Sequence, residues 1–157
     1  MYKRQEVPLE DGGACNLGSI NLSRFVKDGF TPEASIDWDQ LAESSETLVR
    51  FLDNVVTWNE DLNALPKQRQ AASETRRLGL GVMGIADMLN QLGVAYDSEQ
   101  GTMMIEKVME YITNASYQAS SFIAKEKGAS SIFDEEAYME CPFAVSYTHL
   151  RAHETAT

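Results

Sequence analysis

The sequence comprises 157 residues, of which 43% are hydrophobic and 24% are charged, and its formal net charge is −11. The length suits one ordinary domain, and the composition is that of a globular protein. The acidic balance argues against binding to nucleic-acid phosphates or to an anionic membrane surface, because both need clustered Lys and Arg. No apolar run approaches the roughly 18 residues of a membrane span, and no signal peptide is expected at the start.

The chain contains two cysteines, Cys15 and Cys141. Two distant cysteines predict no disulfide framework, so we expect a reducing, cytoplasmic compartment. Cys15 stands where a polar, Gly-containing loop over 6–13 enters an apolar run, a place where a thiol can be reactive yet sheltered. A buried structural cysteine is the commoner alternative for such a residue on its own. Cys141 lies beside Pro142 without a neighbouring base, and we interpret it as incidental.

The first half of the chain predicts one strand and two helices. Apolar residues over 15–25 indicate a short, mostly buried strand, followed by a turn. Apolar residues at steps of three and four predict a helix over 37–59, with Asp37 capping its first turn. Pro66 opens a second helix at a position where a missing N–H costs nothing. Because residues 67–77 are polar almost all round, we expect that helix to be largely solvated.

The second half predicts another strand and a long helix. Residues 78–84 alternate glycines with large apolar side chains, which suits a short buried strand that ends in a tight turn. A short helix over 85–92 and a long amphipathic helix over 97–128 follow, and residues 130–140 indicate a loop with one helical turn. The pattern predicts an α/β fold that is helix-rich with about two short strands. Two strands cannot close a sheet or barrel, so we expect part of a larger domain.

Gly79, Gly81 and Gly84 match the glycine spacing of the dinucleotide-binding fingerprint, and Asp97 lies roughly where a ribose-binding acid could stand. That fingerprint requires an apolar strand running into the first glycine. Residues 72–77 are instead polar and helix-prone. The favoured interpretation is therefore a strand whose glycines let another backbone approach closely.

Two further residue pairs could bind ligands. His149 and His153 have the spacing of a helical metal pair, but they lack a third ligand nearby, and a frayed tail is the favoured interpretation. No metal site is predicted. Arg76 and Arg77 could bind a phosphate, although such a pair more often marks a solvated helix end.

Three stretches together carry a family resemblance: Glu6–Leu9 with Ala14–Leu22, then Arg76–Gly84, then Gly93–Ser98. On these motifs, residues 6–144 resemble the large, catalytic subunit of ribonucleotide reductase, with the greatest likeness to its adenosylcobalamin-dependent (class II) branch. The resemblance implies that the chain is a partial segment of a ten-stranded α/β barrel.

The resemblance also implies two catalytic residues. The family's active-site loop reads Asn-Pro-Cys-Gly-Glu, in which the Cys carries a thiyl radical and the Glu transfers protons. By position, Glu6 matches that Glu, and Cys15 matches one of two thiols that deliver reducing equivalents and become a disulfide. Tyr2–Gln5 stand where the family has Asn-Pro-Cys-Gly, so the radical cysteine has no counterpart in this chain. The second thiol and the cobalamin-binding residues have none either.

The implied activity is reduction of ribonucleotides to 2′-deoxyribonucleotides, for DNA precursor synthesis, with adenosylcobalamin and a thioredoxin-like reductant serving the full-length enzyme. A homodimer is compatible with the resemblance. We expect residues 1–5 and 145–157 to be non-native ends, residues 6–144 to be the barrel fragment, and the chain to be inactive alone. The alternative hypothesis is a small acidic helical interaction module in which Cys15 is structural.

Overall fold

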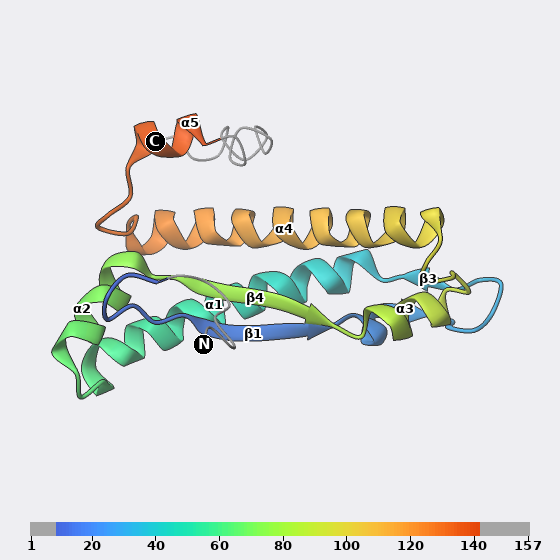
Figure 1. Ribbon diagram of the computed structural model, residues 1–157, viewed down its shortest axis with the longest axis horizontal. Coiled ribbons are helices and arrows are strands. Elements are labelled where there is room, and N and C mark those ends of the chain that lie inside the picture. Colours follow the sequence, from blue (N-terminus) through green and yellow to red (C-terminus); the bar gives the residue numbers. More distant parts are fainter. Residues whose placement is uncertain (1–8, 142–157) are drawn as a thin grey trace, which may run out of the picture.

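The computed structural model describes residues 9–141. Most strands lie in the first part of the chain, and the last strand stands between two groups of helices (Figure 1). The helices are the short 3₁₀ helix η1 (Leu22–Phe25), α1 (Trp38–Leu62), α2 (Pro66–Thr75), α3 (Ile85–Gln91), α4 (Glu99–Lys127) and α5 (Glu135–Glu140). The strands are β1 (Asn16–Asn21), β2 (Val26–Lys27), β3 (Ser35–Ile36) and β4 (Leu78–Met83).

The two longer strands, β1 and β4, form a parallel pair whose register runs from Asn16 opposite Leu78 to Asn21 opposite Met83. Parallel strands need a long crossover connection, which α1 and α2 supply here. The short strands β2 and β3 pair antiparallel. The α/β class and the two main strands are therefore confirmed, while the sheets of the described residues contain two strands each and show no closed barrel.

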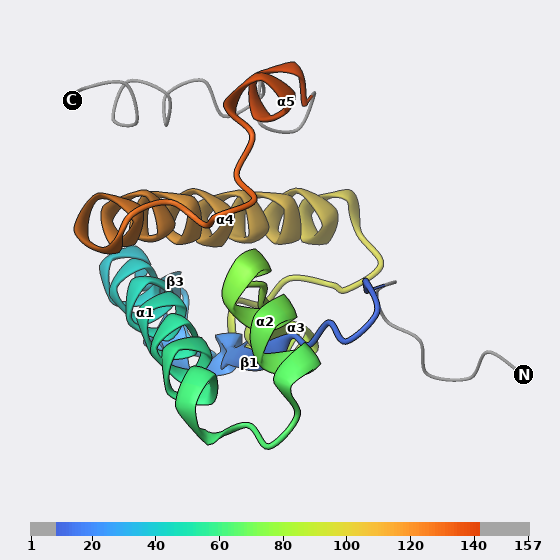
Figure 2. The same cartoon turned by 90° about the vertical axis from the view of Figure 1, so that its left-hand side faces the viewer.

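Among residues 9–141, helices cover one face of the β1–β4 pair and leave the other open. Ile20 on β1 and Leu80 on β4 pack among apolar side chains of α1 and α4. Because successive strand residues point to opposite faces, Leu17 and Gly79 belong to the other face. Figure 2 shows α4 and α1 bordering the pair along adjacent sides, with α5 beyond α4 on the side away from the strands.

The apolar core is concentrated at the carboxyl end of the two strands. The exposed fraction is 2% or less for Leu22, Met88 and Leu89. The last two belong to α3, so apolar side chains of α3 pack this helix against the carboxyl end of the strands. The buried members of this cluster are Ile20, Leu22, Ile36, Leu41, Met88, Leu89, Val94, Val108 and Ile112.

Side-chain caps or a proline mark the starts of the three longest helices. Asp37 accepts a hydrogen bond from the backbone N–H of Gln40, which confirms the predicted cap of α1. Pro66 stands in the first turn of α2, as predicted. Ser98 caps α4 by accepting from the N–H of Gly101.

The first predicted strand was too long. β1 ends at Asn21 because the side chain of that residue accepts hydrogen bonds from the backbone N–H and hydroxyl of Ser23, which bends the chain into η1. Helix α1 also continues beyond its predicted end, to Leu62. No helix within the described part of the chain is both long and apolar enough to cross a membrane.

Candidate functional site

Cys15 immediately precedes β1 and is half-buried, as its position between loop and apolar run predicted. Cys15 and Leu17 are two residues apart, so they point to the same face of the strand pair, the one that the helices leave uncovered. Its Sγ lies 3.8 Å from the carbonyl oxygen of Asn16, to which the thiol donates weakly. The thiol thus lies at the amino end of β1, beside the first residues of β4.

The uncovered face beside Cys15 has little side-chain volume. Gly79 and Gly81 supply the β4 side, and Ser19 lies opposite Gly81. Leu17, 65% exposed, extends over Gly79. Small residues on this face leave space next to the thiol that larger side chains would fill.

Ion pairs join the loop before Cys15 to the rest of the structure. Glu10 accepts a hydrogen bond from the Arg77 guanidinium at 3.1 Å, and Asp11 pairs with Lys67 of α2. All four of these side chains are more than a third exposed. Exposed ion pairs contribute little free energy, so this loop is held lightly.

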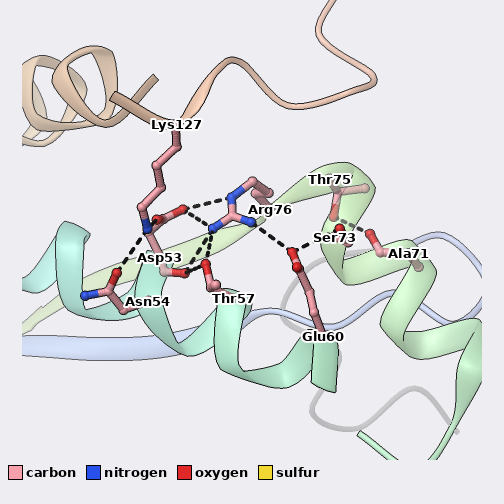
Figure 3. Close-up of polar contacts among 9 residues, drawn as sticks. All are labelled: Asp53, Asn54, Thr57, Glu60, Ala71, Ser73, Thr75, Arg76 and Lys127. Carbon is pink, nitrogen blue, oxygen red and sulfur yellow. Dashed lines mark hydrogen bonds and ion pairs between the residues drawn. The ribbon is translucent and has the colours of Figure 1, made fainter. Parts of the chain in front are cut away.

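Arg76, one residue away, has the opposite environment. It adopts a left-handed backbone conformation with φ of 44°, ends α2 and turns the chain into β4. Figure 3 shows its guanidinium directed at α1, where it donates to Asp53 Oδ1 at 2.7 and 2.9 Å and to Thr57 Oγ1 at 2.9 Å. It also donates to Glu60 Oε1 at 3.2 Å. The amino end of β4 is thereby fastened to α1.

Asp53 is the centre of this cluster, with only 5% of its surface exposed. Its second oxygen, Oδ2, accepts from Lys127 Nζ of α4 at 2.6 Å (Figure 3). Burial by itself raises the pKa of this carboxyl, but the hydrogen bonds and charges of Lys127 and Arg76 outweigh burial and hold the pKa below its ordinary value. Asp53 is therefore ionised at neutral pH and joins α1, α4 and the start of β4.

This cluster corrects one prediction. Arg76 is not a solvated helix end, because burial of Asp53 draws its guanidinium inward. The carboxylates of Asp53 and Glu60 also occupy the donors that a phosphate would need. The second helix, which the sequence predicted to be largely solvated, is buried at Ala71 and Ala72.

The family model described as "Ribonucleotide reductase, barrel domain" matches residues 5–155. The chain belongs to the ribonucleotide reductase barrel-domain family. This membership favours a segment of a ribonucleotide reductase over the alternative of a small acidic interaction module.

Named reductases are similar to the chain over most of its length. It is 41% identical over 133 residues to the vitamin B12-dependent ribonucleoside-diphosphate reductase of Mycobacterium tuberculosis, which covers 85% of this chain and 18% of the relative. The enzyme of the same name from Thermoplasma acidophilum is 44% identical over 125 residues, 78% of this chain and 15% of the relative. The ribonucleoside-diphosphate reductase subunit alpha of Chlamydia pneumoniae is 37% identical over 116 residues, 73% of this chain and 10% of the relative. The chain thus spans less than a fifth of the length of these relatives.

The glycine motif of this reductase-family segment does not form a dinucleotide loop. Gly79 and Gly81 lie inside β4, and only Gly84, with φ of 72°, stands at the turn into α3. The dinucleotide fingerprint places its glycines at the turn between strand and helix. The interpretation of glycines that allow close approach within a strand agrees with this geometry.

The structure places only some of the other predicted residues. Glu6, His149 and His153 lie outside the described residues. Cys141 is exposed at the end of α5. Among residues 9–141, no three His, Cys, Asp or Glu side chains are grouped closely enough to hold a metal ion.

A groove of about 660 Å³ lies along β1 and α1, and Cys15 is not among the residues that line it. Ser19 and Asn21 line it from β1, and Arg24, Glu43 and Phe51 line it from η1 and α1. β1 has only β4 as a strand neighbour among the described residues, so the groove follows an unpaired strand edge. The candidate site is Cys15, because it carries a thiol, and this groove is not part of that site.

Sequence reasoning missed the Asp53 cluster. A signal was present, because Asp53 falls between Leu52 and Val56 on the buried stripe of α1. A charged residue on a buried stripe needs a charged partner. Nothing in the sequence indicated that the partners would be Arg76 and Lys127.

Proposed function

We propose that this chain is part of an enzyme that reduces ribonucleotides to 2′-deoxyribonucleotides, and that Cys15 is one of the two thiols that supply the electrons. The observation that carries the proposal is the position of Cys15 in a barrel-domain segment. The thiol is half-buried at the mouth of β1, on the strand face that α1 and α4 do not cover. In an α/β barrel that face is directed inward, where a substrate would be enclosed.

The reaction needs two electrons and a proton carrier. The ribose 2′-hydroxyl leaves as water and a hydrogen replaces it, while two thiols lose two electrons and two protons and join as a disulfide. Cys15 would be one of these thiols. Glu6 would move the proton, because a carboxylate can accept and return one. A thiyl radical on another cysteine, outside this chain, would activate the substrate.

The parent enzyme would use adenosylcobalamin, which supplies the initiating radical when bound. Support comes from the vitamin B12-dependent names of the Mycobacterium and Thermoplasma relatives. A thioredoxin-like protein would return the disulfide to the dithiol, and the enzyme would work in the cytoplasm, where a homodimer is compatible with this role. Cys15 would serve this chemistry from the protein side, and no residue of the chain is assigned to the cobalamin.

The missing strands of a ten-stranded barrel would pair with the open edges of β1 and β4. Each of these strands has one strand neighbour among the described residues. Exposed edges of this kind are normally covered or paired in stable proteins. In the proposal, residues 6–144 form this barrel segment.

The test uses the complete reductase gene, recovered by sequencing the DNA upstream of the codon for Glu6. An Asn-Pro-Cys-Gly sequence there supports the proposal, while a native start with unrelated sequence favours the interaction module. In the complete enzyme, Cys15→Ser should lower sustained turnover with thioredoxin by at least about 100-fold. Cys141→Ser is the matched control and should keep turnover, since Cys141 is exposed on α5. Full activity of Cys15→Ser would overturn the assignment.

The isolated chain provides a second test. With adenosylcobalamin, a dithiol and ribonucleotide, it should form no deoxyribonucleotide, because the radical cysteine lies outside it. Product formation above that of the cofactor alone would contradict the proposal.

A further inference from the structure

Cys15 Sγ rests against the place where a side chain of residue 79 would begin. A Cβ atom built on Gly79 would lie 3.2 Å from Cys15 Sγ, and it would overlap Leu17 Cδ2. The separation of 3.2 Å is shorter than the ordinary contact between a carbon and a sulfur, so one of the two groups would have to move. The absent side chain of Gly79 therefore leaves the space in which the sulfur sits.

The two neighbours of this empty position differ in their freedom to move. Leu17 is 65% exposed, so its side chain can turn into solvent at little cost. Cys15 is half-buried and has a single rotatable side-chain bond, with its thiol beside the Asn16 carbonyl. Any atom added at residue 79 would therefore displace the sulfur or cover it, once Leu17 has moved aside.

Gly81 provides the comparison on the same strand face. A Cβ built there would meet Ser19 Oγ at 3.5 Å and the Gly18 carbonyl oxygen at 3.9 Å, both ordinary contacts. Neither Gly79 nor Gly81 has a positive φ, so backbone conformation does not require glycine at either position. The requirement at residue 79 comes from the thiol and Leu17, and it is absent at residue 81.

We propose that Gly79 is a positioning residue for Cys15: its lack of a side chain fixes where the sulfur stands at the mouth of β1. The proposal rests on the proposed role of Cys15 as a redox thiol. It extends that role to β4, because the strand that carries Gly79 sets the direction from which a second thiol or a reductant can reach the sulfur.

The experiment measures the reactivity of Cys15 in the 157-residue chain. Cys141→Ser removes the exposed second thiol, so that Cys15 alone reacts with the chromogenic reagent dithiobis(nitrobenzoate). The Cys15 thiolate attacks one reagent sulfur, a mixed disulfide forms, and a nitrothiobenzoate thiolate leaves with the electron pair. In this background, Leu17→Ala is compared with Leu17→Ala plus Gly79→Ala, which isolates the contact with sulfur.

Adding the methyl group at residue 79 should change the rate constant of Cys15 by at least about threefold, since thiol reactions depend on access to the sulfur. A slower reaction shows a covered sulfur, and a faster one shows a sulfur moved into solvent. Gly81→Ala adds the same methyl group to the same face and should leave the rate unchanged. Equal rates with and without Gly79→Ala, across a pH series, would overturn the proposal.

A thermodynamic cycle keeps the test decisive if Gly79→Ala lowers stability. The shift in thermal midpoint caused by Gly79→Ala is measured with Cys15 present and with Cys15→Ala, both in the Leu17→Ala background. If the sulfur is the group that the methyl meets, the shift will be smaller without it. Identical shifts would overturn the contact. Failure of the proposed function would be seen separately, as an active Cys15→Ser reductase, and it would leave this result unaffected.

Discussion

The two ends of the β1–β4 pair are held by different forces. At the carboxyl end, Leu22, Met88 and Leu89 are 2% exposed or less, and apolar contact dominates. At the amino end, Arg76 and Lys127 converge on the buried Asp53. Apolar packing is indifferent to pH, whereas a buried ion cluster depends on the charge of its members.

The difference has a consequence for Cys15, which lies at the charged end. Arg76 anchors β4 to α1 on the face that the helices cover, while Arg77, the next residue, pairs with the exposed Glu10 of the loop before Cys15. The strand beside the thiol is therefore firmly placed, and the loop that leads into the thiol is lightly held. This combination suits a redox thiol, because the sulfur must have a fixed position and must also be accessible to the groups that react with it.

Truncating the apolar end should have the largest effect. Leu89 is fully buried, at 0% exposure. Leu89→Ala should lower the free energy of unfolding by about 4 kcal/mol, through lost burial and a residual cavity. Chemical denaturation monitored by circular dichroism measures the change. Met103→Ala on α4, where the side chain is 55% exposed, is the control and should cost less than about 0.5 kcal/mol.

Neutralising the charged end should cost somewhat less. Asp53→Asn keeps the shape of the side chain but leaves Arg76 and Lys127 without their shared carboxylate, so we expect a loss of about 3 kcal/mol. Glu126→Gln removes one partner of the exposed pair between Arg50 and Glu126, and it should change stability much less than Asp53→Asn does, because solvent screens an exposed pair. Equal losses in the two variants would show that burial of Asp53 does not strengthen the cluster.

Acidification should reveal that the stability of the charged end depends on pH and that of the apolar end does not. The pKa of Asp53 is lower in the folded chain than its ordinary value, so its stabilisation is complete above the unfolded pKa and is lost as pH falls through the folded pKa. Asp37 and Glu126 also have lowered pKa values, through hydrogen bonds from Lys27 and Arg50 respectively. The comparison is therefore between variants: from pH 6 to the acid range, Leu89→Ala should lose as much stability as the unmodified chain, and Asp53→Asn should lose less.

The smallest effect is expected in the loop before Cys15. Glu10→Gln removes the exposed pair with Arg77 and should lower stability by about 0.5 kcal/mol or less. Amide hydrogen exchange should nevertheless quicken in residues 10–14, since their remaining ties are few. Unchanged exchange there would show that other contacts hold the loop.

Local signals in the sequence were sufficient for the long helices and the two main strands, but not for the short strands β2 and β3. The cap at Asp37, the helix start at Pro66 and the glycine-bearing strand at 78–83 follow from residue chemistry that acts within a few neighbours. Such signals were weaker at boundaries: Asn21 ended β1 early, through a side-chain hydrogen bond that competes with the strand. The candidate residue Cys15 came from its sequence motif, and Glu6 stays a prediction.

The long helices, the two main strands and the family could be read from the sequence, because periodicity, caps and motifs lie in neighbouring residues. The short elements η1, β2 and β3 were not predicted, and neither were the partners of Arg76 or the surroundings of Cys15. Asp53, Arg76 and Lys127 are far apart in the chain, and their contact depends on how α1, β4 and α4 pack. The closeness of Gly79 to Cys15 depends on the parallel register of β1 and β4, which no local pattern specifies.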